Sequence, residues 1–223
     1  EYRLQGVIAC LNEIKTTGGT LFILGDFFDF WFDCRNHVPK ALKPVVNTLA
    51  DLRKNGIEIH YIGGNHDYWI KGYLTQELGI HFYPETMIFS YQNTRFYCLH
   101  GDQVVYSHPS YPHIRKFLRA PLAIALLKCL PVKWIYTLGE HVSHYNRALQ
   151  HIPRVPDPMI KKLQHFLLEK LQQGYDIAIS GHVHKPHCKE DHGKTMVILG
   201  DWIHHHTYGI WDTSGFRLIH YKR

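Results

Sequence analysis

The 223-residue sequence predicts an α/β fold with layered sheets, and two observations support this prediction. Short apolar runs with the length of buried strands alternate with stretches in which apolar residues recur every three or four positions. Hydrophobic residues make up 45% of the chain, which is enough for a sizeable core and excludes a disordered protein. Because no linker segment separates the elements, we expect one domain.

The expected elements follow one another in a regular order. Apolar runs predict strands over residues 20–24, 57–62, 95–99, 176–180, 195–199, 208–211 and 216–220. Apolar residues at helical spacing predict helices over 4–14, 42–52 and 160–171. The second of these helices is followed by Asn55-Gly56 and the third by Gly174, and glycine is typical of the position just after a helix.

Residues 108–158 differ from the rest of the chain, because they contain no strand pattern and are interrupted by prolines. We expect them to form a helical insertion, or cap, on a core made of residues 1–107 and 159–223. The apolar run 120–127 is too short to span a bilayer, and basic residues flank or interrupt its surroundings: Arg115, Lys116, Arg119, Lys128 and Lys133. This combination is typical of a segment at a membrane surface. A slot for acyl chains and an ordinary helical hairpin are the alternatives.

Polar clusters follow four of the expected strands. They are Gly25-Asp26-Phe27-Phe28-Asp29, Gly63-Gly64-Asn65-His66-Asp67, His100-Gly101-Asp102 and Gly181-His182-Val183-His184. Open α/β sheets place their ligand sites at the carboxyl ends of strands, and Asp, Asn and His suit Mn, Fe, Zn or Co. A single cluster of this kind is more often a turn or a hydrogen-bonded histidine. Four such clusters at four strand ends together predict one metal site.

This ordered set of motifs resembles the calcineurin-like metallophosphoesterases over nearly the whole chain outside the insertion. The resemblance implies a two-sheet sandwich flanked by helices, with two divalent metal ions at the strand ends. Mn²⁺ is the expected ion, with Fe, Zn or Co as alternatives. The resemblance also implies that Asp26 bridges the two ions. The other implied ligands are Asn65, His100 and His182 for one ion and His184 for the other.

The same resemblance implies two catalytic residues and one departure from the family pattern. His66 would contact the scissile phosphoryl group, and Asp29 would orient His66. The family opens with Asp-x-His on its first strand, and no such motif precedes Asp26 here. We expect that strand to precede Glu1 in a longer protein. A chain that truly lacked the motif would instead be a non-catalytic scaffold.

A finer resemblance, to the UDP-2,3-diacylglucosamine diphosphatases of lipid A synthesis, rests on residues 25–32, 64–69 and 199–202. It implies hydrolysis of UDP-2,3-diacylglucosamine to UMP and 2,3-diacylglucosamine 1-phosphate. The implied partners are this UDP-linked acylated glucosamine and a membrane surface, and the implied location is the cytoplasmic face of the bacterial cell membrane. Candidates for substrate contact are His108, Asn146 and Arg147. Better-known members carry Arg where this chain has His66.

Charge, hydropathy and cysteine content indicate which ligands and which cellular compartment suit the protein. Lys and Arg number 25 against 19 Asp and Glu, and this basic balance favours phosphate-bearing ligands, nucleic acid or an anionic membrane without choosing among them. A nuclease or nucleotide phosphodiesterase is the second hypothesis for the function. The sequence shows no stripe of aromatic and basic residues that could stack on single-stranded nucleic acid, so we expect no nucleic acid partner. The sequence contains no run of about 18 uncharged apolar residues, so we expect no transmembrane helix. The five scattered cysteines favour a reduced, intracellular protein.

Overall fold

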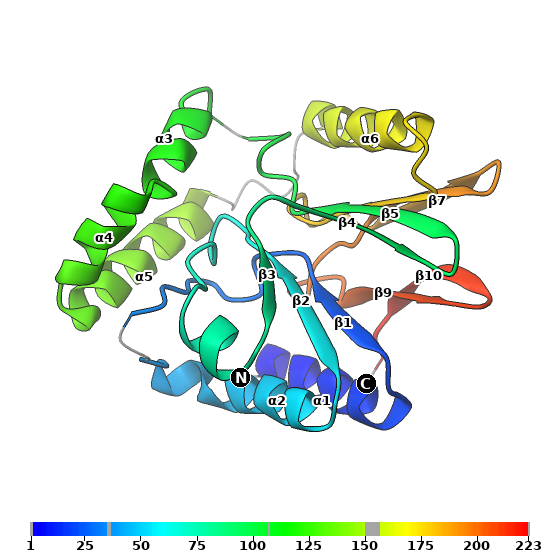
Figure 1. The fold of residues 1–223 in the computed structure, drawn as a ribbon. Coiled ribbons are helices and arrows are strands. Elements are labelled where there is room, and N and C mark those ends of the chain that lie inside the picture. The colour runs from blue at the N-terminus through cyan, green and yellow to red at the C-terminus, as the bar shows by residue number, and fades with distance from the viewer. Residues whose placement is uncertain (1, 35–36, 107, 150–156, 223) are drawn as a thin grey trace.

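The computed structural model describes residues 2–34, 37–106, 108–149 and 157–222, without the side chains of 2–3, 140 and 142–149. These residues form layers of helices and sheets (Figure 1). A three-stranded parallel sheet has the order β1 (Thr20–Ile23), β2 (Glu58–Ile62), β3 (His81–Tyr83). A five-stranded mixed sheet has the order β4 (Thr86–Tyr91), β5 (Thr94–Leu99), β6 (Ile177–Ser180), β8 (Lys194–Ile198), β7 (His187–Asp191). The β-hairpin of β9 (Thr207–Asp212) and β10 (Gly215–His220) completes the strands.

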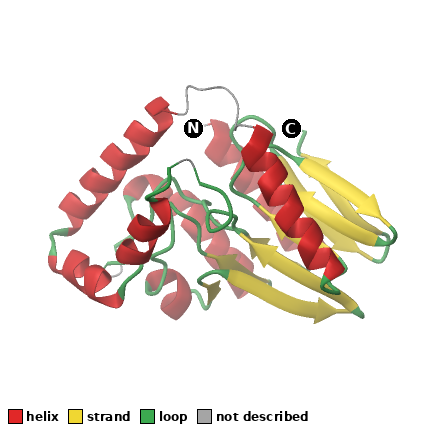
Figure 2. Ribbon diagram, turned by 90° about the horizontal axis from the view of Figure 1, so that it is seen from above, coloured by secondary structure: helices red, strands yellow, loops and turns green. Residues whose placement is uncertain are grey.

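Helices cover the outer faces of the two sheets. Helices α1 (Tyr2–Thr17) and α2 (Lys43–Lys54) lie under the three-stranded sheet in Figure 1, and α6 (Asp157–Gln172) lies over the five-stranded sheet. Figure 2 shows α6 crossing the strands from above. A short 3-10 helix (Lys40–Leu42) precedes α2, and a π-helix (Tyr73–Glu77) connects β2 to β3. This arrangement confirms the predicted layered α/β fold.

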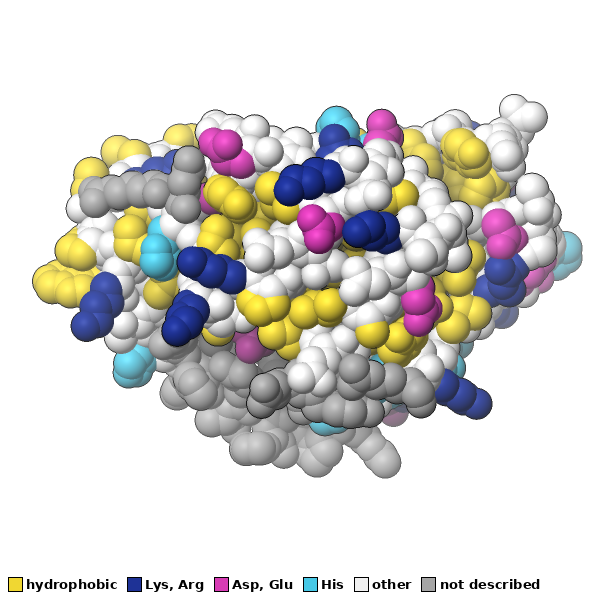
Figure 3. Space-filling view, turned by 90° about the horizontal axis from the view of Figure 1, so that it is seen from below, with side chains coloured by type: hydrophobic (Ala, Val, Ile, Leu, Met, Phe, Trp, Pro, Cys, Tyr) yellow, Lys and Arg dark blue, Asp and Glu magenta, His cyan; other side chains and the backbone are white. Residues whose placement is uncertain are grey.

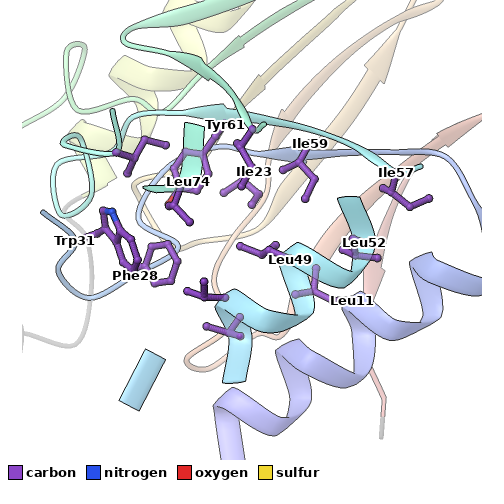
Figure 4. Packing of buried hydrophobic residues seen from close by; sticks show 14 residues of the cluster. Leu11, Ile23, Phe28, Trp31, Leu49, Leu52, Ile57, Ile59, Tyr61 and Leu74 are labelled. Atoms are coloured by element: carbon purple, nitrogen blue, oxygen red, sulfur yellow. The ribbon is translucent and has the colours of Figure 1, made fainter. Parts of the chain in front are cut away.

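Three apolar clusters hold the layers together. Leu49 and Leu52 of α2 pack on Ile59 of β2 in the cluster that Figure 4 shows, and all three are fully buried. A second cluster fills the space between the sheets, and a third joins α6 to the five-stranded sheet through Leu163 and Leu167. Each fully buried leucine stabilises the fold by roughly 1.5–3 kcal/mol relative to an exposed one. The helical spacing in the sequence therefore identified the buried faces of α2 and α6.

Three strands were not anticipated from the sequence: β3, β4 and β7. β3 has only three residues, and β7 is an edge strand whose last four residues are exposed. An exposed edge strand needs no apolar residues, so it leaves no apolar run in the sequence.

The segment between β5 and α6 contains helices α3 (Tyr111–Leu118), α4 (Pro121–Cys129) and α5 (Val132–Leu149), on the left in Figure 1. α4 has a single buried residue, Ala123. Within the described residues no single helix is long and apolar enough to cross a membrane, although α4 and the first part of α5, bent by 117°, pass that test together.

Candidate metal and phosphate site

The strand ends bring three of the predicted ligands into one cluster. β5 pairs with β6 in parallel register, Leu99 opposite Ser180, so His100 and the 181–184 turn leave the sheet side by side. Ligand atoms of Asp26, His100 and His182 all lie within 4.8 Å of one another. His100 Nε2 is 3.2 Å from Asp26 Oδ2 and 3.2 Å from His182 Nδ1.

Main-chain carbonyls determine which ring nitrogen of His100 and of His182 carries the hydrogen. His100 Nδ1 lies 2.7 Å from the Leu24 carbonyl oxygen, and His182 Nε2 lies 3.1 Å from the Val105 carbonyl oxygen. A carbonyl only accepts hydrogen bonds, so each of these nitrogens carries a hydrogen. In the neutral rings, the two nitrogens that face each other therefore both present lone pairs. A cation or a shared proton between them removes that repulsion.

The charged groups of this cluster shift one another's pKa values. Burial works to raise the pKa of the Asp26 carboxyl, but His100, His66 and His182 together lower it far below its ordinary value. Burial works to lower the pKa of His100, but the Asp26 carboxylate raises it to about 9. Burial and the charge of His100 lower the pKa of His182 to about 4. The cluster thus favours one positive charge next to the Asp26 carboxylate.

The other two predicted ligands lie next to the cluster. Asn65 Oδ1 is 3.2 Å from His100 Nε2, so its amide oxygen faces the same point. His184 is half-buried, and its Nδ1 is 4.0 Å from Asp201 Oδ2. His184 is not part of the three-residue cluster, and its role as a ligand of a second ion stays a prediction. This donor set of one carboxylate, one amide oxygen and imidazoles fits divalent cations of the Mn, Fe, Zn or Co type.

The backbone is strained where these ligands sit. Asp26, His182 and His184 have φ angles of 53°, 66° and 55°, in the left-handed region that side chains rarely adopt. Each such residue costs about 1–3 kcal/mol, and strain of this kind gathers at functional sites. Three strained residues within one ligand set therefore support a functional rather than a structural role.

Asp67 holds the loop that carries Asp26, a role that the motif analysis missed. The Asp67 side chain is fully buried, and its two oxygens accept main-chain hydrogen bonds from Asp26, Phe27, Phe28 and Gly64. The Tyr61 hydroxyl donates a further hydrogen bond to Asp67. Its place inside the Gly-Asn-His-Asp motif was the available signal for this role.

Glycine permits the close approach of the loops. A β-carbon on Gly64 would lie 2.2 Å from Asp26 Oδ1, and one on Gly25 would lie 2.6 Å from His100 Nδ1. Any larger residue at either position would displace a predicted ligand.

The predicted catalytic pair is adjacent but differs in detail. His66 is half-buried, and its Nδ1 lies 3.0 Å from the main-chain carbonyl oxygen of Asp29. His66 also donates its main-chain N–H to Asp26 Oδ1 at 2.9 Å, which ties it to the cluster. Asp29 thus holds the ring through its carbonyl, and the role of its exposed carboxylate stays a prediction.

The predicted substrate contacts remain predictions. His108 is exposed, and its Nδ1 lies 2.7 Å from the Ser110 hydroxyl. Asn146 and Arg147 belong to α5, in the part whose side chains lie outside the described residues.

Two basic residues that were expected to flank an exposed apolar run instead point into the protein. Arg115 Nε donates to Asp102 Oδ2 at 2.7 Å, and Arg119 donates to the same oxygen at 3.2 Å. Both also pair with Glu85. Because Asp102 is fully buried, these arginines are unavailable to a membrane surface. Their partners are distant in sequence, so no local pattern could have revealed the contacts.

The sequence profile of the calcineurin-like phosphoesterases matches residues 2–186. The chain belongs to the calcineurin-like phosphoesterase family. This phosphoesterase is 30% identical over 221 residues to a UDP-2,3-diacylglucosamine hydrolase of Porphyromonas gingivalis, covering 92% of this chain and 84% of that protein. It is 26% identical over 200 residues to a UDP-2,3-diacylglucosamine hydrolase of Nitrosococcus oceani, covering 87% and 79%.

A solved structure supports the fold of the phosphoesterase. A protein described as a novel archaeal phosphodiesterase superposes with a TM-score of 0.50 at 15% identity, covering 99% of this chain and 92% of that one. Membership of the family, together with the Asp26–His100–His182 cluster, makes the phosphoesterase a hydrolase that uses divalent metal ions.

Proposed function

We propose that the phosphoesterase hydrolyses the diphosphate bond of UDP-2,3-diacylglucosamine in lipid A biosynthesis, giving UMP and 2,3-diacylglucosamine 1-phosphate. The cluster of Asp26, His100 and His182 carries this proposal, because its facing nitrogens and carboxylate are arranged to receive a cation. The named activity of the Porphyromonas gingivalis and Nitrosococcus oceani relatives supports this choice of substrate.

The proposed ligands are those of the sequence prediction: Asp26 for both ions, Asn65, His100 and His182 for one, and His184 for the other. Mn²⁺ is the proposed ion. When bound, a pair of divalent cations neutralises phosphate charge and lowers the pKa of water. The carbonyls of Leu24 and Val105 keep the two imidazoles in the tautomers that such ions require.

His66 is the proposed residue at the departing oxygen. The Asp29 carbonyl holds the hydrogen on His66 Nδ1, which leaves Nε2 for the substrate. Water attacks the α-phosphorus, the bond to the bridging oxygen breaks, and the water oxygen remains on UMP. Protonated His66 donates a hydrogen bond from Nε2 to the bridging oxygen as it leaves.

We propose that residues 108–158 act as an insertion that meets the acylated part of the substrate at the cytoplasmic face of the membrane. Much of its apolar surface is exposed: Ile114, Phe117, Leu122, Leu126, Leu130, Trp134 and Leu138. Lys116, Lys128 and Lys133 are exposed as well. Figure 3 shows hydrophobic side chains beside basic ones at its left end, where the insertion lies. Apolar groups flanked by lysines favour an anionic lipid surface.

Binding to vesicles tests this surface. The double variant Leu122→Ser, Leu126→Ser should bind vesicles of anionic lipid more weakly, because both side chains are largely exposed. Leu168→Ser, on α6, is the matched control and should bind like the wild type. Equal binding by all three proteins would remove the insertion from the proposal.

The reaction itself is tested by hydrolysis of UDP-2,3-diacylglucosamine with Mn²⁺ in H₂¹⁸O, with products identified by mass spectrometry. We expect one ¹⁸O in UMP and none in the sugar phosphate. Cyclic nucleotides and DNA are assayed in parallel. Faster hydrolysis of either would favour a nucleotide phosphodiesterase or nuclease and overturn the proposed substrate.

A further inference from the structure

Arg119, the residue that follows α3, reaches from the insertion to two of the loops that carry predicted metal ligands. One guanidinium nitrogen donates to the Gly64 carbonyl oxygen at 3.1 Å and to Asp102 Oδ2 at 3.2 Å. Gly64 directly precedes Asn65, and Asp102 lies two residues after His100. Only 9% of the Arg119 side chain is exposed, so these contacts are made largely without water.

Further contacts hold the guanidinium in this place. Its other terminal nitrogen donates to Glu85 Oε1 at 3.1 Å, and its Cζ atom lies 4.0 Å from the centre of the Tyr68 ring. Trp69 Nε1 donates to the carbonyl oxygen of Leu118 at 3.0 Å. The insertion is therefore attached to the 63–69 loop at several points next to Asn65.

The geometry points to Arg119 as a positioning residue for the metal site, an inference that rests on the proposed ligand set. A planar guanidinium with several donors can bridge the Gly64 carbonyl and the Asp102 carboxylate at once, whereas an ammonium is a single point charge. By fixing the peptide between Gly64 and Asn65, Arg119 fixes where the Asn65 amide oxygen meets His100 Nε2. The core site is thus completed by a residue of the insertion.

Arg115 provides a matched comparison within the same ion-pair network. It contacts Asp102 and Glu85, as Arg119 does, but within the described part of the chain it makes no hydrogen bond or ion pair with residues 63–69. A role confined to stability would make the two arginines alike. A role in positioning Asn65 would set Arg119 apart.

Calorimetric titration of the full chain with Mn²⁺ alone separates these roles. Arg119→Met should weaken Mn²⁺ binding about 10- to 100-fold, the range expected for the loss of a residue that orients a ligand. Arg119→Lys should fall between Arg119→Met and the wild type. Arg115→Met should lower the melting temperature while keeping Mn²⁺ affinity within about 3-fold of the wild type, below the range for a lost orienting residue. Lys116→Met, an exposed neighbour, should change neither.

The melting temperature with and without Mn²⁺ gives a second readout. Arg119→Met should shrink the rise in melting temperature that Mn²⁺ produces, since tighter ligand binding gives greater stabilisation. Wild-type affinity in Arg119→Met, with the same fall in melting temperature in both conditions, would overturn the inference. If Arg119→Met does not fold, wild-type affinity in Arg119→Lys would overturn it. Failure of the wild type itself to bind Mn²⁺ would instead contradict the proposed metal site.

Discussion

The core of the phosphoesterase and its insertion use apolar residues in opposite ways. In α6, Leu163 and Leu167 are fully buried against the five-stranded sheet. In the insertion, 68% of Phe117, 72% of Leu122 and 66% of Trp134 are exposed. The sequence predicts apolar helices in both regions, so the difference in their burial arises from what surrounds each helix in the fold.

One face of the insertion is closely attached to the core, and its buried Ile135 shares an apolar cluster with Phe32 and Cys34. A β-carbon on Gly139 of α5 would lie 2.4 Å from the ring of Phe30, and the Tyr136 hydroxyl donates to the Phe32 carbonyl oxygen at 3.1 Å. These contacts reach the loop just after Asp29. The insertion therefore combines an attached face beside the predicted site with an exposed apolar face, whereas the core keeps its apolar residues for stability.

The largest effect of a substitution is expected at Asp26, because the core site depends on its single carboxylate. Asp26→Ala should reduce hydrolysis to background, because the proposed bridging ligand is lost and bound cations supply several kcal/mol of transition-state stabilisation. Elemental analysis should show loss of both metal ions. Unchanged metal content would contradict the bridging role of Asp26.

Substitution of His66 should affect the rate of hydrolysis but not the binding of metal. His66→Ala should lower turnover about 100- to 10,000-fold, the usual contribution of a general acid, with bound metal nearly unchanged. Hydrolysis rates and metal content measured on the same preparation check this. A parallel loss of metal would make His66 structural.

Core and insertion should also differ in stability. Leu167→Ala should lower the free energy of unfolding by about 2–5 kcal/mol, because it leaves a cavity under α6. Leu126→Ala, at an exposed insertion position, should change it by no more than about 0.5 kcal/mol. Urea denaturation of both variants measures the difference. Similar losses would show that the insertion face is packed in solution.

The core site should also give the stability of the protein a pH dependence. In the metal-free fold the pKa of His100 is raised to about 9, so between about pH 6.5, the ordinary value for histidine, and pH 9 the folded state keeps a proton that the unfolded state has lost. The free energy of unfolding should therefore fall as pH rises through this window. Saturating Mn²⁺ should remove the decline, which urea denaturation at several pH values checks. A flat profile without metal would contradict the raised pKa.

Most of the fold could be predicted from the sequence because burial leaves local patterns. The run 20–24 and the leucines of α2 and α6 gave strands and helices close to those observed. β7 could not be predicted, because an exposed edge strand carries no apolar signal.

The candidate site shows the same division between local and distant contacts. Asp26, His100 and His182 follow the carboxyl ends of β1, β5 and β6, where the sequence pattern predicted a shared ligand site. The contact of His66 Nδ1 with the Asp29 carbonyl oxygen depends on loop geometry, which a sequence motif does not specify. The inward direction of Arg119 depends on Asp102, whose place beside it only the folded chain shows.

The central claim is that the four strand-end clusters form one centre for two cations. Anomalous diffraction from crystals of the protein grown with Mn²⁺ tests this claim most directly. We predict one peak among Asp26, Asn65, His100 and His182 and a second between Asp26 and His184. No peak beside Asp26, or peaks only at other histidines, would contradict the claim.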